Sequence, residues 1–460
     1  MSGMDGMGMG RDLGLLLPEI VVLLTAVAVL VAEMLRRPRW ALPLLVSGLL
    51  LATGFAARLV GQDTTVFSET FRIDDLSVWA KLILLPATAL TALLAAPEVR
   101  GTDREGTVYS LLAFTTLGPL ALAGAGDTMF LVLGTLLSSL GSLALVAYPR
   151  DDRATEAALK YFVFGSVTGA AMIFGLTFWF AGSGSTLLAD LGRLTSAPLA
   201  AAGLLAVLIG LGYKAALAPF HFWAPDAYDG GPVAVAAYLS VVPKVGAIFA
   251  LAQAVRDLPT GLVNWRLALA ALAAVSMTWG NLAALPQTNV VRLLAYSSVA
   301  QAGYFLLGVV AIGRSDLATR ALVVFAAAYA AMNLGAFAIV AGAGRDLTAL
   351  RGLGRTDPWA GGALVVFLLS LVGVPPLAGF VGKALLFGAA LDGGFGWLAV
   401  VAILNSVLSL AVYLRLVVAL YRAPEGEPRA TRPTVGVWAC ALALTIAIGL
   451  AAQALVGRVG

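Results

Sequence analysis

Long apolar runs follow one another along almost the whole chain and constrain its fold more than any other feature. Short stretches of Arg, Asp, Gly and Pro separate about fourteen of these runs. A helical membrane span needs roughly 20 mostly apolar residues. Apolar residues make up 60% of the chain and charged residues 12%, against about 25% charged residues in a soluble domain. We therefore predict an all-α polytopic membrane protein with about 14 transmembrane helices.

The breaks between the runs also predict organisation and orientation. Residues 1–12 are polar and rich in Gly and Met and are expected to be disordered, and residues 13–460 are expected to form a single transmembrane domain. Arginines concentrate in the loop after the first span and in alternate loops on that side, which the positive-inside rule makes cytoplasmic. Both termini are then predicted on the outer side. The predicted spans begin near Leu13, Ala41, Asp74, Thr107, Asp127, Ala158, Leu199, Pro232, Trp265, Asn289, Thr319, Gly361, Trp397 and Val435.

Two of the spans contain sequence that a continuous helix cannot accommodate. The seventh runs into LAPFHFWAPDAYDGGP (217–232), and the twelfth contains VGVPPLAGF (372–380). Proline removes a backbone donor and clashes with the preceding turn, so helices 7 and 12 are predicted to be discontinuous. Paired broken helices in two halves of a membrane protein point to a transport site. The alternative is a pair of proline kinks that serve packing alone.

Lysine occurs at only five positions, and three of them lie deep in apolar sequence. Lys214, Lys244 and Lys383 would each cost roughly 2.5–3.5 kcal/mol at the bilayer centre on insertion scales. A desolvated lysine can release its proton near neutral pH, whereas arginine stays protonated, so these three residues are interpreted as a proton relay. The competing interpretation pairs them with helix-end carbonyls or acids. Lys81 and Lys160 are expected to extend to the membrane surface.

His221, the only histidine, follows the first break and can pass a proton between its two ring nitrogens. It joins the lysines as a candidate proton-transfer residue, although a lone histidine is more often structural. Pro243 precedes Lys244 and frees the carbonyl of Leu239 to receive a water or an ammonium. Polar residues in other spans could carry water between these points: Asn281, Gln287, Asn289, Ser297, Ser298, Gln301, Tyr304, Asn333 and Asn405.

Other classes of function find little support. One cysteine (Cys440) and one histidine cannot build an iron–sulfur cluster or a structural zinc site, so no cofactor is expected in this chain. The net charge of +4 is small and spread over loops, and it does not indicate binding to nucleic acid. If the protein belongs to a redox machine, electrons travel in another subunit.

At these same residues the chain resembles a known family. The segment GLGYKAALAPFHFWAPDAYDGGP (210–232) resembles the signature of the antiporter-like membrane subunits of respiratory complex I. Three further segments are similar to the subunit N family of bacterial NADH-quinone oxidoreductase: 280–304, 369–383 and 411–421. Lysine at position 383 fits subunit N or the longer subunit L, and the length of 460 residues fits N.

The resemblance implies fourteen helices with two inverted five-helix repeats, helices 4–8 at about 107–255 and helices 9–13 at about 265–421. It makes Lys214, Lys244, Lys383 and His221 the proton-transfer residues of a subunit that couples NADH-to-quinone electron transfer to proton pumping. FMN, iron–sulfur clusters and quinone would lie in partner subunits. The implied partners are the lipid bilayer and the other membrane subunits, including the antiporter-like subunit M and subunit K, in the inner (plasma) membrane of a bacterium.

Two positions depart from the family pattern. The family has a glutamate in its fifth span that pairs with the broken-helix lysine, and this chain has Leu136 at that position. Gln301 stands where histidine is common. Without the acid, desolvation alone acts on Lys214 and disfavours its charged form. Two alternative functions follow: a Mrp-type cation/proton antiporter subunit, which shares the fold and the lysines, and a non-pumping paralogue in a variant complex.

Overall fold

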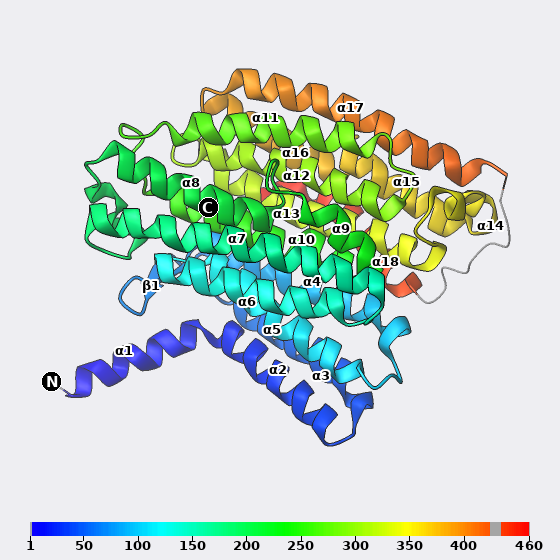
Figure 1. Cartoon of the computed structure of the whole chain (residues 1–460), viewed down its shortest axis with the longest axis horizontal. Helices are drawn as coiled ribbons and strands as arrows, with labels where there is room; N and C mark the ends of the chain where they lie inside the picture. Colours follow the sequence, from blue (N-terminus) through cyan, green and yellow to red (C-terminus); the bar gives the residue numbers. More distant parts are fainter. Residues whose placement is uncertain (1, 424–433, 460) are drawn as a thin grey trace.

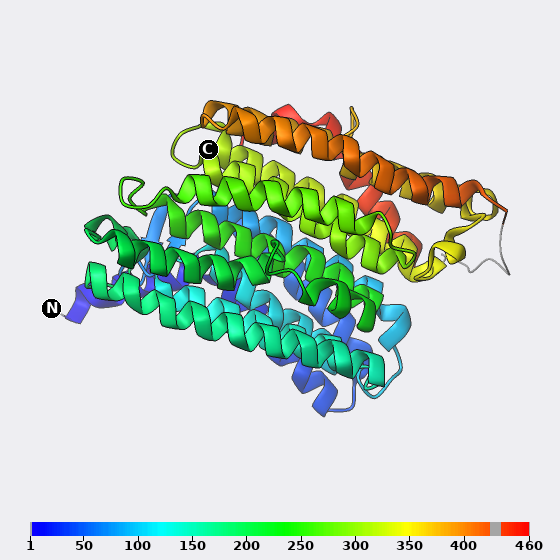
Figure 2. The ribbon, with the colours of Figure 1, turned by 45° about the horizontal axis from the view of Figure 1, so that its top comes forward.

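Helices lying side by side along the long axis build nearly the whole molecule (Figures 1 and 2). The computed structural model describes residues 2–423 and 434–459. Within these residues, twelve helices are long and apolar enough to cross a membrane, and two apolar helices are shorter. The helices of the first half are α1 (Ser2–Leu15), α2 (Leu17–Met34), η1 (Pro38–Trp40), α3 (Ala41–Ala57), α4 (Asp75–Val99), α5 (Glu105–Ala123), α6 (Thr128–Ala147), α7 (Asp152–Ser183), η2 (Leu188–Arg193), α8 (Ala197–Ala215), α9 (Trp223–Gly230) and α10 (Val233–Arg256).

The second half continues the same arrangement, and together the halves supply a helix for each of the predicted spans. The sixth span begins earlier than predicted, at Asp152, because Asp151 caps the helix by accepting from the backbone N–H of Ala154 (2.7 Å). The remaining helices are α11 (Trp265–Ala284), α12 (Val290–Ala311), α13 (Leu317–Ala343), η3 (Leu347–Leu350), α14 (Leu353–Thr356), α15 (Pro358–Val372), α16 (Ala378–Asp392), α17 (Gly396–Tyr421), α18 (Val435–Leu450) and α19 (Ala452–Val456).

The chain start and the first long loop carry structure that the sequence analysis did not anticipate. Residues 2–15 form α1 where a disordered segment was expected, and this helix extends away from the bundle (Figure 1). Asp12 accepts from the backbone N–H of Phe67 (3.1 Å), which ties α1 to the loop after α3. That loop forms an antiparallel hairpin of β1 (Thr64–Val66) and β2 (Phe71–Ile73).

Both predicted breaks are confirmed. Helix α8 ends at Ala215, and Ala216 adopts a left-handed conformation (φ 56°) that a residue with a side chain seldom adopts. The chain resumes as α9 at Trp223. The second break follows α15, where Gly373 takes a φ of 97° that suits glycine, and α16 begins at Ala378. Each of the two predicted five-helix segments therefore contains one broken helix.

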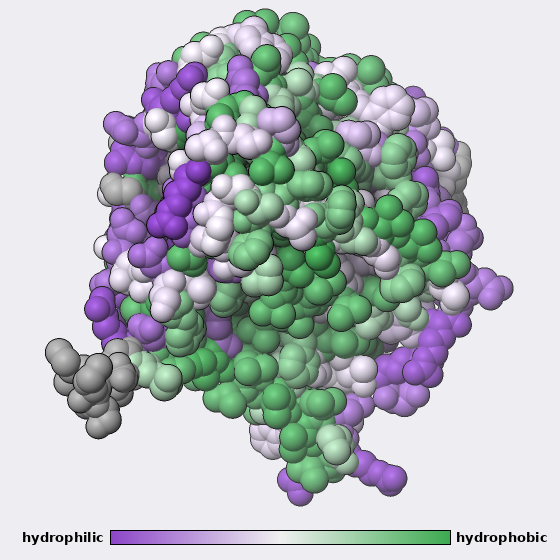
Figure 3. All heavy atoms as spheres, turned by 60° about the vertical axis from the view of Figure 1, so that its left-hand side comes forward, coloured by the Kyte–Doolittle hydropathy of each residue, from purple (hydrophilic) through white to green (hydrophobic). Residues whose placement is uncertain are grey.

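The three most enclosed helices are α10, α12 and α13, and they pack against one another at the centre of the bundle. Outer helices such as α2, α3 and α7 expose apolar side chains, as membrane-facing helices do. Figure 3 shows apolar residues over the middle of one face and hydrophilic residues gathered toward opposite margins. The charged groups that lie deep in this structure therefore stand out from their surroundings.

Candidate functional site

Lys244 lies on α10, the fully enclosed helix, and its side chain has no exposed surface. Its Nζ donates to the backbone carbonyl oxygen of Ser298 (2.6 Å) and to Oγ of the same residue (2.9 Å), both on α12. The carbonyl of Leu239, which the sequence analysis offered as an acceptor, is not its partner. The ammonium instead reaches across to the neighbouring helix α12.

Lys383 lies on α16, just beyond the second break, and is 2% exposed. Its Nζ donates to the carbonyl oxygens of Leu371 (2.9 Å) and Val372 (3.0 Å), the last residues of α15, and to Oγ of Ser406 (3.3 Å). It also lies 3.9 Å from the ring centre of Tyr304. The carbonyl end of a helix carries partial negative charge, so the broken helix provides an acceptor for this lysine without any acid.

Hydrogen-bonding side chains lie between Lys244 and Lys383, beginning at the residue next to the Lys244 partner. Ser297, next to the Ser298 that binds Lys244, lies 2.5 Å from the hydroxyl of Tyr413. Gln301, one turn along α12, donates from Nε2 to the Tyr413 hydroxyl (3.5 Å) and to the Leu371 carbonyl (3.1 Å). That carbonyl also accepts from Lys383. All of these groups are buried.

Lys214 occupies the last turn of α8, directly before the first break, and is fully buried. Its Nζ donates to the hydroxyl oxygens of Tyr161 on α7 (2.8 Å) and Ser139 on α6 (2.9 Å). Both partners are neutral oxygens on helices other than its own. Lys214 therefore differs from Lys383, which donates to two backbone carbonyls.

Aromatic rings fill the space between Lys214 and Lys244. The Tyr161 ring lies 4.9 Å from the ring of Trp223, and Trp223 lies 6.1 Å from the ring of Tyr228. The Tyr228 hydroxyl reaches Oγ of Ser298, but at 3.5 Å, which is long for a hydrogen bond between hydroxyls. Polar contact on this side of Lys244 is therefore sparser than on the side toward Lys383.

His221 lies within the first break and is 4% exposed. Its Nε2 accepts a hydrogen bond from the indole N–H of Trp279 on α11 (2.8 Å). An indole nitrogen only donates, so Nε2 carries no proton and His221 is held as the neutral tautomer with its proton on Nδ1. Trp279 itself is 50% exposed. The histidine can exchange a proton at Nε2 only when this indole moves.

None of the three central lysines pairs with an acid in the part of the chain that the structure describes. Among the described residues, the ion pairs include neither Lys214 nor Lys244 nor Lys383. Lys81 on α4, by contrast, is buried and pairs with the partly buried Glu19 on α2 (2.9 Å).

This pair corrects the expectation that Lys81 extends to the membrane surface. Its side chain has no exposed area, because Glu19 on the neighbouring helix compensates its charge inside the protein and the Phe71 ring lies 5.4 Å from Nζ. Lys160, given the same expectation, is 42% exposed in its side chain and pairs with Glu156 and Asp226.

Leu136, which the resemblance placed where a glutamate is expected, lies on an outer face of α6 and is 44% exposed. It lines a cavity of about 70 Å³ between α6 and α7 together with Ser139 and Tyr161, the two residues that bind Lys214. The substitution therefore leaves leucine near the lysine's hydroxyl partners, at the rim of this cavity.

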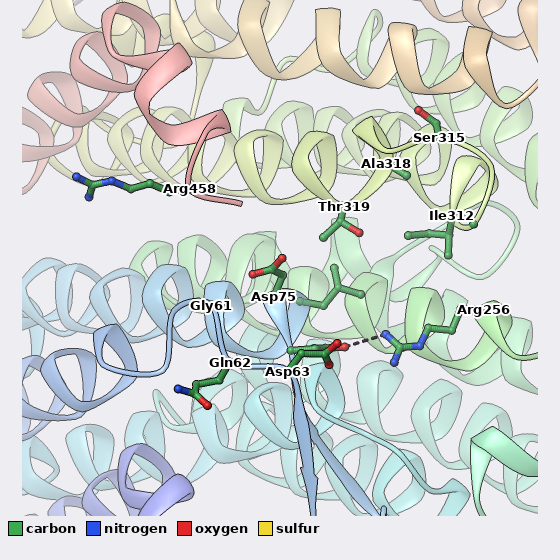
Figure 4. A pocket seen from close by; sticks show the side chains of 13 residues that line it. Gly61, Gln62, Asp63, Asp75, Arg256, Ile312, Ser315, Ala318, Thr319 and Arg458 are labelled. Carbon is green, nitrogen blue, oxygen red and sulfur yellow. Dashed lines mark hydrogen bonds and ion pairs between the residues drawn. The ribbon is translucent and has the colours of Figure 1, made fainter. Parts of the chain in front are cut away.

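A larger cavity, of about 420 Å³, lies at the end of the bundle where α10 terminates and contains none of the candidate residues. Arg256 forms an ion pair with Asp74 at its wall (2.8 Å; dashed line in Figure 4). Asp63, Asp75 and Arg458 also line it. Its mixed charges mark a solvated end of the protein, separate from the buried lysines. The described residues include no cluster of three or more His, Cys, Asp or Glu side chains that could hold a metal ion.

The structure brings forward residues that the sequence did not single out. Tyr161, Ser139, Tyr413 and Ser406 all contact the buried lysines or the groups that link them. Each is an ordinary residue of an apolar span in the sequence. Only their placement on neighbouring helices, opposite a lysine, distinguishes them.

Comparison with known proteins gives a consistent result. The chain matches the family described as NADH:quinone oxidoreductase/Mrp antiporter, transmembrane, over residues 125–409. It is 42% identical to NADH-quinone oxidoreductase subunit N 1 of Streptomyces griseus, over 96% of this chain and 95% of the relative. A chain of respiratory complex I from Thermus thermophilus with bound aureothin is 32% identical, with a TM-score of 0.85 over 96% of this chain and 100% of that chain. A chain of the Mrp complex from Dietzia sp., 23% identical with a TM-score of 0.84 over 97% and 96% of the two chains, shares the fold.

Proposed function

The chain belongs to the NADH:quinone oxidoreductase/Mrp antiporter transmembrane family, and from this membership we propose that it is the N-type membrane subunit of a proton-translocating NADH-quinone oxidoreductase. It acts as one subunit of a translocase and carries the proton half of the reaction. The observation that carries the proposal is the set of three buried lysines, none of which forms an ion pair with an acid among the described residues, with hydrogen-bonding side chains lying between two of them.

In the proposed mechanism Lys244 and Lys383 exchange protons through the polar groups between them. An ammonium held only by neutral oxygens can lose a proton at a smaller electrostatic cost than one paired with a carboxylate. Tyr413 and Ser297 supply hydroxyls that both donate and accept. The buried Oε1 of Gln301 has no hydrogen-bond partner among the described residues and offers an acceptor next to Tyr413. Lys214 and His221 form the other part of the proton path, on the side of Lys244 where the aromatic rings of Tyr161, Trp223 and Tyr228 lie.

Redox chemistry would take place elsewhere in such a complex. We assign FMN, the iron–sulfur clusters and quinone to partner subunits, and expect the neighbouring antiporter-like subunit M and subunit K among the membrane partners. We also place the protein in the bacterial inner (plasma) membrane, and the positive-inside rule supports an orientation with both termini outside.

The test of this assignment is purification of the tagged protein from native membranes in mild detergent, with mass spectrometry of the proteins that accompany it. We expect the other membrane subunits together with flavin and iron–sulfur subunits. Membrane subunits without an NADH-oxidising module would indicate a variant complex with another electron donor. Recovery alone, or with small antiporter partners only, would contradict the proposal and favour a Mrp-type cation/proton antiporter.

A second candidate function follows from Lys214. Because this lysine has no acid partner and Leu136 occupies the position of the family's glutamate, the chain could be a non-pumping paralogue that fills its place in a variant complex. One property distinguishes the pumping subunit from the non-pumping paralogue. A non-pumping subunit tolerates loss of its central lysines without any change in proton translocation, whereas a pumping subunit does not.

A further inference from the structure

A small cavity lies between α6 and α7, next to the first broken helix. Its volume is about 70 Å³. Thr135 and Tyr161 line its buried part and are 5% and 1% exposed. Leu136, Leu140 and Phe162 also line it and are largely exposed, so they form its rim. The cavity is therefore mostly apolar, with the hydroxyl-bearing residues Thr135, Ser139, Tyr161 and Ser166 in its lining.

Hydroxyl side chains form a stripe along the buried side of α6 at this cavity. Thr135, Ser138, Ser139 and Ser142 are spaced by three or four residues and so lie on neighbouring positions of the helix surface. Thr135 and Ser138 are buried, and their hydroxyls have no hydrogen-bond partner among the described residues. Buried polar groups in proteins as a rule bond to protein or to ordered water. Of the two, Thr135 lines the cavity, and its unsatisfied hydroxyl points to water as its partner.

The same stripe reaches Lys214. Ser139 and Tyr161, the two hydroxyls that accept from its Nζ, both line the cavity. The ammonium is thus separated from the cavity interior by one layer of hydroxyl groups. A water needs about 10–15 Å³ of such volume and two to four polar partners, and the cavity provides room for a few waters.

We propose that this cavity binds ordered water and is a proton contact of Lys214, with Tyr161 and Ser139 as the hydroxyls that connect the two. The inference rests on the proposed proton-translocating function and adds a site to it. The hydroxyls stabilise the protonated amine by accepting hydrogen bonds, but they bring no fixed negative charge. Lys214 can therefore both hold and release a proton without a carboxylate beside it.

Proton transfer from Lys214 through Tyr161 to a cavity water conserves protons and bonds. One N–H bond of the Lys214 ammonium breaks as an O–H bond forms on the Tyr161 oxygen, while the phenol's own proton passes to a cavity water. The neutral amine then takes up a proton from the opposite direction. One proton has moved, and Tyr161 and Lys214 end in the states in which they began.

The test uses the intact complex reconstituted in liposomes, with NADH-driven proton translocation followed by a pH-sensitive dye. Tyr161→Phe removes the hydroxyl that binds Lys214. Its matched control is Tyr213→Phe, since the Tyr213 hydroxyl lies in the same aromatic cluster but donates to the Tyr161 carbonyl and not to a lysine. We expect Tyr161→Phe to lower the translocation rate on the order of tenfold, as for loss of a hydrogen bond to a charged group. The pH at which translocation declines should move downward, because the protonated amine loses an acceptor.

A second variant fills the cavity without touching the lysine. Gly169→Leu places an aliphatic side chain there, since nothing lies within 4 Å of where its Cβ would be. Val167→Leu on the same helix is the control, because Val167 is 65% exposed and does not line the cavity. Thr135→Val serves as a third, nearly isosteric variant should Gly169→Leu assemble poorly. The cavity variants should lose translocation several-fold relative to Val167→Leu.

Lys214→Met separates failure of this inference from failure of the proposed function. If Lys214→Met lowers translocation while Tyr161→Phe and the cavity variants match their controls, the water site is overturned and the proposed function stands. If Lys214→Met has no effect, the role of Lys214 is wrong and the inference falls with it. Lower proton translocation in Lys214→Met, in Tyr161→Phe and in the cavity variants supports the inference.

Discussion

The two sides of Lys244 are built differently. Toward Lys383, the Tyr413 hydroxyl lies within hydrogen-bond distance of both Ser297 and Gln301, and Gln301 donates to the backbone carbonyl that also accepts from Lys383. Toward Lys214, aromatic rings fill the space, and a 3.5 Å contact from Tyr228 is the polar approach to the Lys244 site. Proton transfer at one buried lysine can therefore use hydrogen-bonding side chains on one side and depend on water or on movement of aromatic rings on the other.

Breaking the better-connected side should have the largest effect. Gln301→Leu removes the donor to Tyr413 and to the Leu371 carbonyl and also the unpartnered acceptor Oε1. We expect NADH-driven proton translocation to fall on the order of tenfold, measured as the initial rate of dye response in proteoliposomes. Gln301→His, which keeps a donor and an acceptor, should retain most of the rate. Equal rates for the leucine and histidine variants would contradict the connection.

A matched pair of tyrosine variants compares the two sides directly. Tyr413→Phe removes a hydroxyl held at 2.5 Å from Ser297, whereas Tyr228→Phe removes one that lies 3.5 Å from Ser298. Short, well-placed hydrogen bonds contribute more than long ones. We expect a several-fold loss of translocation rate for Tyr413→Phe and less than about a twofold loss for Tyr228→Phe. The reverse order would show that the aromatic side limits transfer.

Adding an acid near Lys214 should change the pH dependence of proton translocation on the less-connected side. Leu136→Glu places a carboxylate at the rim of the cavity that Ser139 and Tyr161 share, near Lys214. A nearby negative charge favours the protonated lysine. We expect a modest change of rate at neutral pH and an upward move of the pH at which translocation declines. An unchanged pH profile would show that the carboxylate does not reach the lysine's surroundings; Leu140→Glu, at the same rim and more exposed, is the control.

Lys81 is the buried lysine outside this comparison, and its removal should have the smallest effect on transport. Lys81→Met leaves Glu19 without its partner, and breaking a buried pair costs about 3–5 kcal/mol. We expect a lower thermal unfolding temperature, seen by differential scanning fluorimetry, with protons moved per NADH unchanged. Lys81→Met combined with Glu19→Gln should recover part of the stability. A loss of translocation in well-assembled Lys81→Met would place this pair in the proton path.

Much of the fold could be predicted because the bilayer imposes simple rules on sequence. The spans, and both broken helices with the prolines that interrupt them, follow from hydropathy and proline chemistry alone. The three central lysines stand out for the same reason, since charge is rare in such runs. Their partners do not stand out: Tyr161 and Ser139 reach Lys214 only because α6, α7 and α8 pack together. The Lys81 error has this cause too, because Glu19 is distant in sequence and adjacent in space.

The most direct test of the account is the effect of Lys244→Ala on proton translocation coupled to NADH oxidation in the intact, reconstituted complex. Lys244 joins the two sides and is held by Ser298 alone among the described residues, through two hydrogen bonds. The account predicts that a fully assembled Lys244→Ala complex moves markedly fewer protons than wild type. Normal translocation in that complex would contradict a lysine-based path through this subunit and favour the non-pumping alternative.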